Sequence, residues 1–241
     1  MSDTFHLDST VSFWNVDRDQ TLTLTGVFKL LQEGAIKHAD LYDVGSRAML
    51  ARGESWVLNR MSAAIHRYPR YEESLHLETW SSGIRGFKGY REFRLRAGEE
   101  LLVSASSLWL YLNVKNKVLT RVPSELAESF PERGDNAFHP DIDKLRLVEP
   151  VAPTGSVEVS VRYSDIDSNG HVNNAAYFDY LQTALARLGE PVRPARIELQ
   201  FAKEIPPTLD LVKVDTQKQD NQLLFRVGSE TECFAKGRLF G

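Results

Sequence analysis

The chain has 241 residues, 42% of them hydrophobic and 26% charged, so it is long enough to bury a core and has no long disorder-like polar stretch. Its net charge of −4 at pH 7 and pI near 5.9 argue against nucleic acid as the main partner. The single cysteine, Cys233, excludes an internal disulfide and a cysteine-rich zinc site.

The first ten residues, MSDTFHLDST, have neither a basic start nor an apolar run, which is not the pattern of a secretory signal. No apolar window approaches the roughly 20 residues that a membrane-spanning helix needs. We therefore expect a cytoplasmic protein without a membrane span.

The first half of the chain predicts one helix followed by strands. Residues 26–45 place Val27, Leu30, Leu31, Ala35 and Ile36 close to helical spacing, with Gly45 as a plausible stop. Alternating segments rich in Val, Leu, Phe and Trp then predict strands within residues 54–68, 73–82, 88–97 and 100–114.

A long connection is expected next, because five of the ten prolines fall between residues 123 and 153 and the segment has weak periodicity. We assign residues 1–122 to an N-terminal half, 123–155 to a linker and 156–241 to a C-terminal half.

The second half repeats the order of the first, with a helix within residues 175–190 and strands within 195–205, 209–217 and 223–230. Residues 11–32 align without a gap on residues 161–182 at a constant offset of 150. One helix followed by several strands, present twice, predicts an α+β fold.

The segment at residues 165–174, DIDSNGHVNN, opens like a calcium-binding EF-hand loop. Calcium is disfavoured, because position 12 of such a loop would be Ala176 instead of a bidentate Glu. The preceding residues also alternate like a strand, whereas an EF-hand requires a helix there. No metal and no cofactor is expected.

If the extended conformation persisted, Asp165, Asp167, Asn169 and His171 would continue an apolar, core-directed strand face. Buried polar groups cost several kcal/mol unless they are paired, and they are tolerated mainly where chemistry needs them. The alternative is a loop in which Asp and Asn only satisfy turn amides. The residues alone leave these two interpretations equal.

The run YSDIDSNGHVNNAAYFDYL resembles the signature of the acyl-acyl carrier protein (acyl-ACP) thioesterases, an Asp-x-Asn-x-His-Val-Asn-Asn run leading into a helix with an early Tyr. The matching residues are Asp167, Asn169, His171, Val172, Asn173, Asn174 and Tyr177. The segments LLQEGAIKHADLYDVG, SWVLNR and RYPRYEESLHLETW followed by GYREF are similar too, so the likeness extends from about residue 11 onward. The family's second catalytic element, a Glu on a strand, is matched by Glu204 in FAKEI, with Ile205 where plant members have a cysteine.

The resemblance implies a tandem hot-dog fold, in which each half is a long helix wrapped by a curved antiparallel sheet. It implies hydrolysis of fatty acyl thioesters on acyl carrier protein, which ends chain elongation and releases free fatty acid. The catalytic set would be Asp167, Asn169, His171 and Glu204. The first half has Asp19 and Thr21 at the places of Asn169 and His171, so we expect one active site per chain.

The roles within this set stay open at the level of sequence. Glu204 could act as general base on water while His171 orients it or moves protons, and Asn169 could hold the carbonyl or the water. Asp167 could orient its neighbours or attack the carbonyl directly. Backbone amides near residues 175–177 could stabilise the oxyanion.

Five cations follow one another along the first half, and they are read either as a solvated strand face or as a docking patch for acidic acyl carrier protein: Arg85, Lys88, Arg91, Arg94 and Arg96. A hot-dog acyl-CoA thioesterase, a hydratase and a non-catalytic acyl-binding protein remain alternatives. The two halves would form a pseudo-dimer within one chain, and a homodimer stays open.

Overall fold

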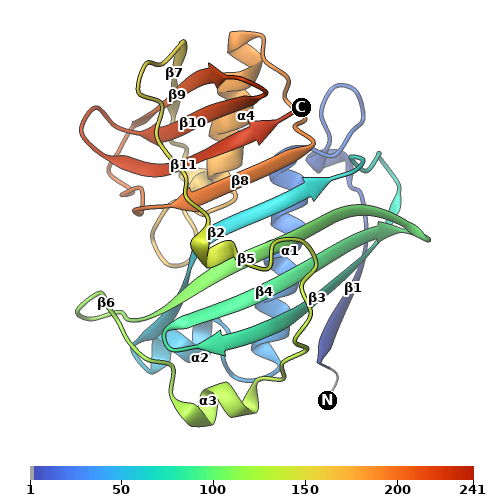
Figure 1. The fold of residues 1–241 in the computed structure, drawn as a ribbon, viewed down its shortest axis with the longest axis vertical. Coiled ribbons are helices and arrows are strands. Elements are labelled where there is room, and N and C mark those ends of the chain that lie inside the picture. The colour runs from blue at the N-terminus through green and yellow to red at the C-terminus, as the bar shows by residue number, and fades with distance from the viewer. Residues whose placement is uncertain (1–2) are drawn as a thin grey trace.

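The computed structural model describes residues 3–241, which form one antiparallel sheet of eleven strands with two long helices against it (Figure 1). The strand order is β1-β3-β4-β5-β2-β8-β11-β10-β9-β7, and β6 pairs with β5 outside this path. The order reads outward from a central β2–β8 pair, so each half contributes five of the ten strands along the path.

The elements of the first half are β1 (Thr4–Thr10), the 3-10 helix η1 (Phe13–Asn15), α1 (Leu24–Asp40), α2 (Ser46–Ala51), β2 (Glu54–Ile65), β3 (Ser74–Arg85), β4 (Lys88–Ala97), β5 (Glu100–Asn113) and β6 (Val118–Leu119). The connection holds α3 (Ser124–Ser129) and the 3-10 helix η2 (Ile142–Lys144). The second half contains β7 (Gly155–Ser160), the 3-10 helix η3 (Tyr163–Asp165), α4 (Ala176–Leu188), β8 (Arg196–Phe201), β9 (Leu211–Gln219), β10 (Gln222–Gly228) and β11 (Cys233–Phe240).

The two long helices are amphipathic and bury their apolar faces against the sheet and against each other. Thr23 caps α1, its hydroxyl accepting a hydrogen bond from the Gly26 amide at 3.0 Å. Phe28 and Phe178, related by the offset of 150, stack with ring centroids 3.7 Å apart. Equivalent residues of the repeat therefore meet where the N-terminal parts of α1 and α4 come into contact.

The sheet joins the halves through β2 and β8, where Met61 pairs with Leu199. Their side chains are buried in a core cluster that includes residues of both halves, among them Leu31 of α1 and Leu181 of α4. The fold is therefore α+β with two hot-dog units in tandem, as predicted.

The connection between the halves crosses the outer face of the first half's sheet (Figure 1). It is held by buried Glu92 of β4, whose carboxylate accepts hydrogen bonds from the Asn136 side chain at 3.1 Å and the Ala137 amide at 2.9 Å. The same carboxylate accepts from the hydroxyls of Ser82 at 2.8 Å and Ser106 at 2.5 Å. Four donors on one buried carboxylate tie the connection to the sheet.

Some predicted boundaries were wrong. The first helix ends at Asp40, and Gly45 is the N-cap of a separate short helix, α2. The strands β1, β6 and β11 were not among those expected. In the part of the chain that the structure describes, no helix combines the length and the apolar character needed to cross a membrane.

Candidate active site

The motif segment folds as a tight turn rather than as an extended strand. The Asp167 amide donates to the His171 carbonyl at 2.9 Å, and the Gly170 amide donates to the Asp167 carbonyl at 3.0 Å. The Asp167 carboxylate accepts the Asn169 amide at 2.8 Å. Gly170 has φ +79°, a left-handed conformation that glycine adopts without strain.

The first half contains the same turn at the offset of 150. The Asp17 amide donates to the Thr21 carbonyl at 2.9 Å, and the Asp17 carboxylate accepts the Asp19 amide at 2.9 Å. Gln20, with φ +57°, stands where the second half has Gly170. The repeat seen in the sequence therefore extends to backbone hydrogen bonding, and Asp17 and Asp167 serve both turns in the same way.

This geometry decides between the two interpretations left open by the sequence: the segment forms a turn, and the strand face does not continue. β7 ends at Ser160, and Asp165 lies in η3 instead of on a strand. Asp165 is only 4% exposed. Its carboxylate accepts a hydrogen bond from the Tyr180 hydroxyl at 2.7 Å and forms an ion pair with Arg162 at 2.8 Å. Asp165 is thus a buried structural carboxylate.

The turn brings His171 to Glu204, which lies three residues beyond the end of β8. The His171 Nε2 and Glu204 Oε2 atoms are 3.4 Å apart, and the two side chains are about equally exposed, at 39% and 43%. Lys117, from the turn between β5 and β6, places its Nζ 3.1 Å from the same Oε2. The candidate site therefore lies at the border of the two halves, with the cation supplied by the first.

Tyr177 of α4 holds the backbone on both sides of Glu204. Its hydroxyl donates to the Lys203 carbonyl at 3.2 Å and accepts from the Ile205 amide at 3.2 Å. The side chain is buried, and burial raises the pKa of the Tyr177 phenol well above its usual range. The hydroxyl consequently stays protonated and bridges the two peptide groups at any ordinary pH.

The other two members of the predicted set lie in the same turn as His171. Asp167 is half-buried and bound to the Asn169 amide, which is a turn-forming contact. Asn169 is exposed beside it. Two of the amides expected to face an oxyanion already donate hydrogen bonds within the protein. The Ala175 amide donates to the Asn173 side chain at 2.8 Å, and the Ala176 amide donates to the Asn173 carbonyl at 2.9 Å.

In the equivalent turn of the first half, Asp17 and Asp19 form ion pairs with an arginine. Arg193 of the second half puts its Nη2 2.5 Å from an Asp17 carboxylate oxygen and 2.7 Å from one of Asp19. Burial would raise the pKa of Asp17, but hydrogen bonds from Arg193 and from the amides of Asp19 and Thr21 lower it overall. A guanidinium of the second half thus neutralises the carboxylates of the first-half turn, in which Thr21 stands at the place of His171.

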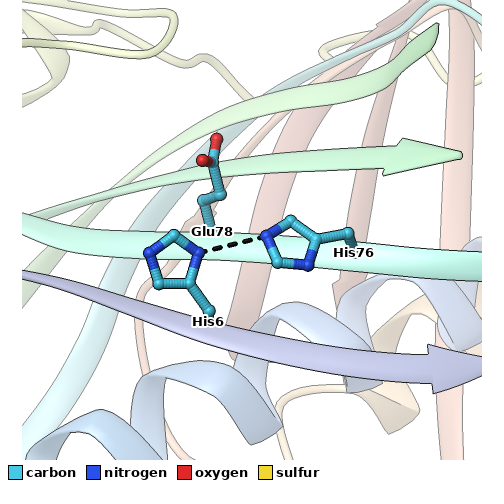
Figure 2. Close-up of side chains that lie close together, drawn as sticks. All are labelled: His6, His76 and Glu78. Atoms are coloured by element: carbon cyan, nitrogen blue, oxygen red, sulfur yellow. Dashed lines mark hydrogen bonds between the residues drawn. The ribbon is translucent and has the colours of Figure 1, made fainter. Parts of the chain in front are cut away.

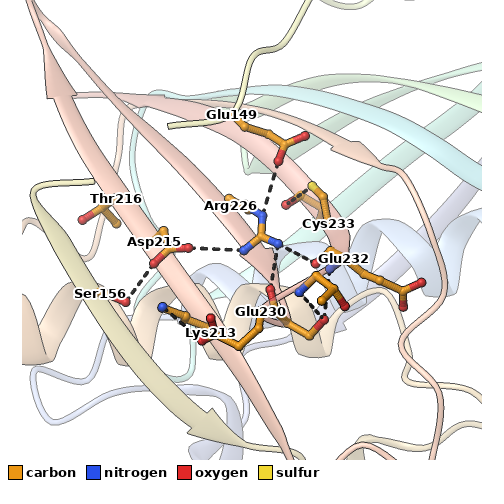
Figure 3. Close-up of polar contacts among 12 residues, drawn as sticks. Glu149, Ser156, Lys213, Asp215, Thr216, Arg226, Glu230, Glu232 and Cys233 are labelled. Atoms are coloured by element: carbon orange, nitrogen blue, oxygen red, sulfur yellow. Dashed lines mark hydrogen bonds and ion pairs between the residues drawn. The ribbon is translucent and has the colours of Figure 1, made fainter. Parts of the chain in front are cut away.

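Cys233 lies in a different environment, beside a polar network on the second half's sheet (Figure 3). There Arg226 pairs with Glu149 at 3.3 Å and with Asp215 at 3.2 Å, and the Cys233 thiol points to the Ala235 carbonyl at 3.6 Å. Burial first, and then the Glu149 charge, raise the pKa of the Cys233 thiol to about 11. A thiol that stays protonated is a poor nucleophile.

The five expected docking cations do not share one surface. Arg91 is only 8% exposed, donates to His38 Nδ1 at 3.0 Å and lies over the Phe130 ring, so its placement on a solvated face was wrong. Lys88 and Arg94 are paired with acidic residues of the connection, Asp143 at 3.1 Å and Asp135 at 3.5 Å. Arg85 lies over the ring of Tyr90, and Arg96 approaches Glu78 at 4.0 Å.

Lys117 was missed by the sequence reasoning. It is 87 positions from Glu204 in a turn with no periodic pattern. The only local signal is the run NVKNK, whose composition is typical of a turn.

The fold and this site define a tandem hot-dog protein with a carboxylate–imidazole pair at the border of its two halves, and comparison with known proteins identifies the family. The acyl-ACP thioesterase N-terminal domain matches residues 2–130, and the acyl-ACP thioesterase C-terminal domain matches residues 149–232. The chain belongs to the acyl-ACP thioesterase family.

Individual relatives agree with this assignment. The chain is 28% identical to a chloroplastic palmitoyl-acyl carrier protein thioesterase of Gossypium hirsutum over 215 residues, which is 83% of this chain and 52% of the relative. It thus spans about half the length of the curated relatives that it matches. The fold is shared with a 12:0-ACP thioesterase from Umbellularia californica (TM-score 0.86, 21% identity, 100% of this chain and 97% of the other covered). It is also shared with an acyl-ACP thioesterase from Bacteroides thetaiotaomicron (TM-score 0.83, 18% identity, 100% and 99% covered).

Proposed function

We propose that this protein hydrolyses fatty acyl thioesters carried by acyl carrier protein and so releases free fatty acid at the end of chain elongation. Membership of the family supports the reaction class, because the curated relatives are named as acyl-carrier-protein hydrolases or thioesterases. The pair of His171 and Glu204 supports the place of the chemistry within this chain.

The observation that carries the proposal is the way in which Glu204 is held. Within residues 3–241, the side-chain ion pairs of Glu204 use one carboxylate oxygen, Oε2, which faces both His171 and Lys117. The second oxygen, Oε1, is left for a water molecule, and the side chain is open enough to receive a substrate. Tyr177 fixes the backbone on either side, so the carboxylate is preorganised.

In the mechanism that we infer from this geometry, Glu204 takes a proton from water as the water oxygen attacks the thioester carbonyl. The tetrahedral intermediate collapses with cleavage of the carbon–sulfur bond, and the departing thiolate receives a proton from Glu204 or His171. The products are the fatty acid and the free thiol of the carrier. Asp167 shapes the turn that presents His171, and Asn169 is the candidate donor to the developing oxyanion.

The test compares a panel of acyl-ACP and acyl-CoA substrates and three variants. Glu204→Gln keeps the size of the side chain but removes the base, and it should lower kcat by about 10²–10⁴-fold. His171→Ala should cost a similar factor, and the double variant should cost far less than the product, since both residues serve one step.

Thr21→Ala is the matched control, because Thr21 occupies the place of His171 in the first half's turn. It should leave kcat within about twofold of the parent protein if one active site lies in the second half. Near-parental kcat in folded Glu204→Gln would contradict the site. Equal or faster turnover of acyl-CoA would contradict the proposed preference for acyl carrier protein. Binding of acyl groups without hydrolysis would contradict the proposal that the protein is an enzyme.

For the carrier protein itself, we propose that the members of the basic cluster other than buried Arg91 contribute to docking: exposed Arg85 and the half-buried, ion-paired Lys88, Arg94 and Arg96. Attraction to an acidic partner is screened over about 8 Å at physiological salt. Hydrolysis of acyl-ACP should therefore fall with salt more steeply than hydrolysis of a small neutral thioester. Parallel salt dependences would contradict the docking proposal and leave the catalytic one untouched.

The remaining predictions concern location and assembly. We propose a cytoplasmic protein, to be tested by cell fractionation. We propose that residues 1–122 and 156–241 form a pseudo-dimer about the β2–β8 pair, and limited proteolysis can test this division. Sedimentation analysis can test whether whole chains form a homodimer.

A further inference from the structure

Four chemistry-bearing side chains form a compact group on the sheet's edge, far along the chain from the motif of the second half. In the pairing of β1 with β3, His6 lies opposite Glu78 and Asp8 lies opposite His76. Successive residues of a strand point to opposite faces, so these four, at alternate positions on two neighbouring strands, share one face. That face is the outer one, because the intervening Leu77 packs toward Gly34 of α1.

Three of these side chains have the spacing of metal ligands. One ligand atom each from His6, His76 and Glu78 lies within 4.8 Å of the others. Figure 2 shows the two imidazole rings facing each other across the strands with Glu78 beside them. The His6 Nδ1 and His76 Nε2 atoms are 3.1 Å apart. Two nitrogens bound tetrahedrally to one zinc ion at about 2.0–2.1 Å would be about 3.3 Å apart, so little movement is needed.

Asp8 supplies the partner that a metal-bound histidine usually has. Its carboxylate lies 2.6 Å from His76 Nδ1, the ring nitrogen remote from His6. A carboxylate there holds the proton on Nδ1 and leaves the lone pair of Nε2 facing His6, which is the orientation that carboxylates give to zinc-bound histidines. In the metal-free protein, the His6 Nδ1–H then donates to His76 Nε2.

We propose that His6, His76 and Glu78 bind one divalent transition-metal ion, with Zn²⁺ as the ion that their donor set fits best, and that Asp8 is a positioning residue for His76. Binding moves the His6 proton from Nδ1 to Nε2, so both facing nitrogens offer lone pairs and the imidazoles stay neutral. Two nitrogens and one carboxylate oxygen leave the fourth position of a tetrahedral ion to water. The ion clamps β1, the edge strand of the first half, to β3.

Within residues 3–241, the cation that pairs with the Glu78 carboxylate competes only weakly for it. Arg96 Nε lies 4.0 Å from Glu78 Oε2, a separation at which an exposed ion pair contributes little. His6 is exposed and the other two ligands are half-buried, so an ion can enter from solvent without unfolding the sheet. The site is independent of the proposed hydrolysis, because none of these residues contacts the turn of His171.

The test uses the whole 241-residue chain, freed of metal with a chelator and then titrated with Zn²⁺ by calorimetry and with Co²⁺ by visible absorption. One ion per chain, with the absorption bands of four-coordinate Co²⁺ and a rise in melting temperature, is the expected result. His6→Ala and His76→Ala should each weaken binding by more than about tenfold. Asp8→Asn should weaken it by about 10–100-fold, as expected for a partner outside the coordination shell.

Two controls separate this site from general binding to histidines and carboxylates. His66→Ala removes another exposed histidine and should leave the affinity unchanged. Glu78→Gln keeps the hydrogen-bonding shape and should weaken binding as the histidine variants do. Affinity retained in His6→Ala/His76→Ala, or no stoichiometric binding up to millimolar Zn²⁺, would overturn the proposal. Because His6, Asp8, His76 and Glu78 lie on the outer face and His66 is exposed, circular dichroism should show unchanged folding.

Discussion

Removing the Tyr177 hydroxyl tests whether Glu204 is held in place by the residues on either side of it. In Tyr177→Phe the ring stays in the core while the bridge between the Lys203 carbonyl and the Ile205 amide is lost. Ile205 is fully buried, so its amide is left without this partner. An unsatisfied buried donor costs about 1–3 kcal/mol, and the second hydrogen bond adds about 1 kcal/mol. We expect the free energy of unfolding to fall by about 2–4 kcal/mol.

The effect on activity should exceed what lower stability explains. A displacement of about 1 Å in a catalytic group can cost about 10²-fold, so kcat should fall by about 10–100-fold at a temperature where the variant is folded. The hydroxyl is occupied by two backbone groups and is not available to substrate, so KM should change little. Combined with Glu204→Gln, the loss should be well below the product of the single losses.

Tyr68→Phe is the matched control for this experiment. Its hydroxyl also donates to a backbone carbonyl, that of Pro194 at 3.0 Å, and burial likewise raises the pKa of the Tyr68 phenol. The control should lose about 1–2 kcal/mol of stability and keep its kcat. Unfolding in urea and steady-state hydrolysis of an acyl-ACP measure both quantities. The reasoning is refuted if Tyr177→Phe loses the expected stability and turns over at the parental rate.

Three further outcomes are expected. Cys233→Ser should keep activity within about tenfold, since its thiol stays protonated; a larger loss that alkylation reproduces would show that the thiol takes part. Burial, and then the charge of Arg91, lower the pKa of His38 to about 3, so the unfolded chain binds a proton that the native state excludes. The free energy of unfolding should therefore fall as pH drops below about 6.5. In His38→Asn, which keeps an acceptor for Arg91, the unfolding free energy measured with urea should change less between about pH 6.5 and 4 than in the parent protein. An equal change in the two proteins would contradict this. Glu92→Ala should lower the free energy of unfolding by about 3 kcal/mol, because the Ala137 amide and the other donors to this carboxylate lose their acceptor. Glu92→Gln should cost only about 1 kcal/mol. Equal losses on thermal unfolding would contradict the idea that these hydrogen bonds stabilise the connection.

The repeat and the motif could be predicted from the sequence because both depend on short-range order. The turn at residues 167–171 closes through hydrogen bonds between residues two to four positions apart, so the spacing of Asp, Asn, Gly and His carries its own geometry. The first-half counterpart repeats that spacing with Asp17 and Thr21, and its backbone follows the same path. Of the two interpretations left open, the continuing strand is wrong and the turn is right; periodicity alone could not decide between them, because it does not reveal the 3-10 helix η3 that precedes the turn.

Contacts between distant segments were decided only by the tertiary structure. Glu204 follows His171 by 33 residues and Lys117 precedes Glu204 by 87, and nothing in either segment specifies their distance until β5, β2 and β8 pair in one sheet. Arg91 illustrates the same limit, since its charge predicted exposure, whereas the fold buries it beside His38 of α1 and Phe130 of the connection. His6 meets His76 across 70 positions through the register of β1 on β3. A local pattern determines which side chains one turn or strand face presents, whereas the register of long-range pairing determines which of those faces meet.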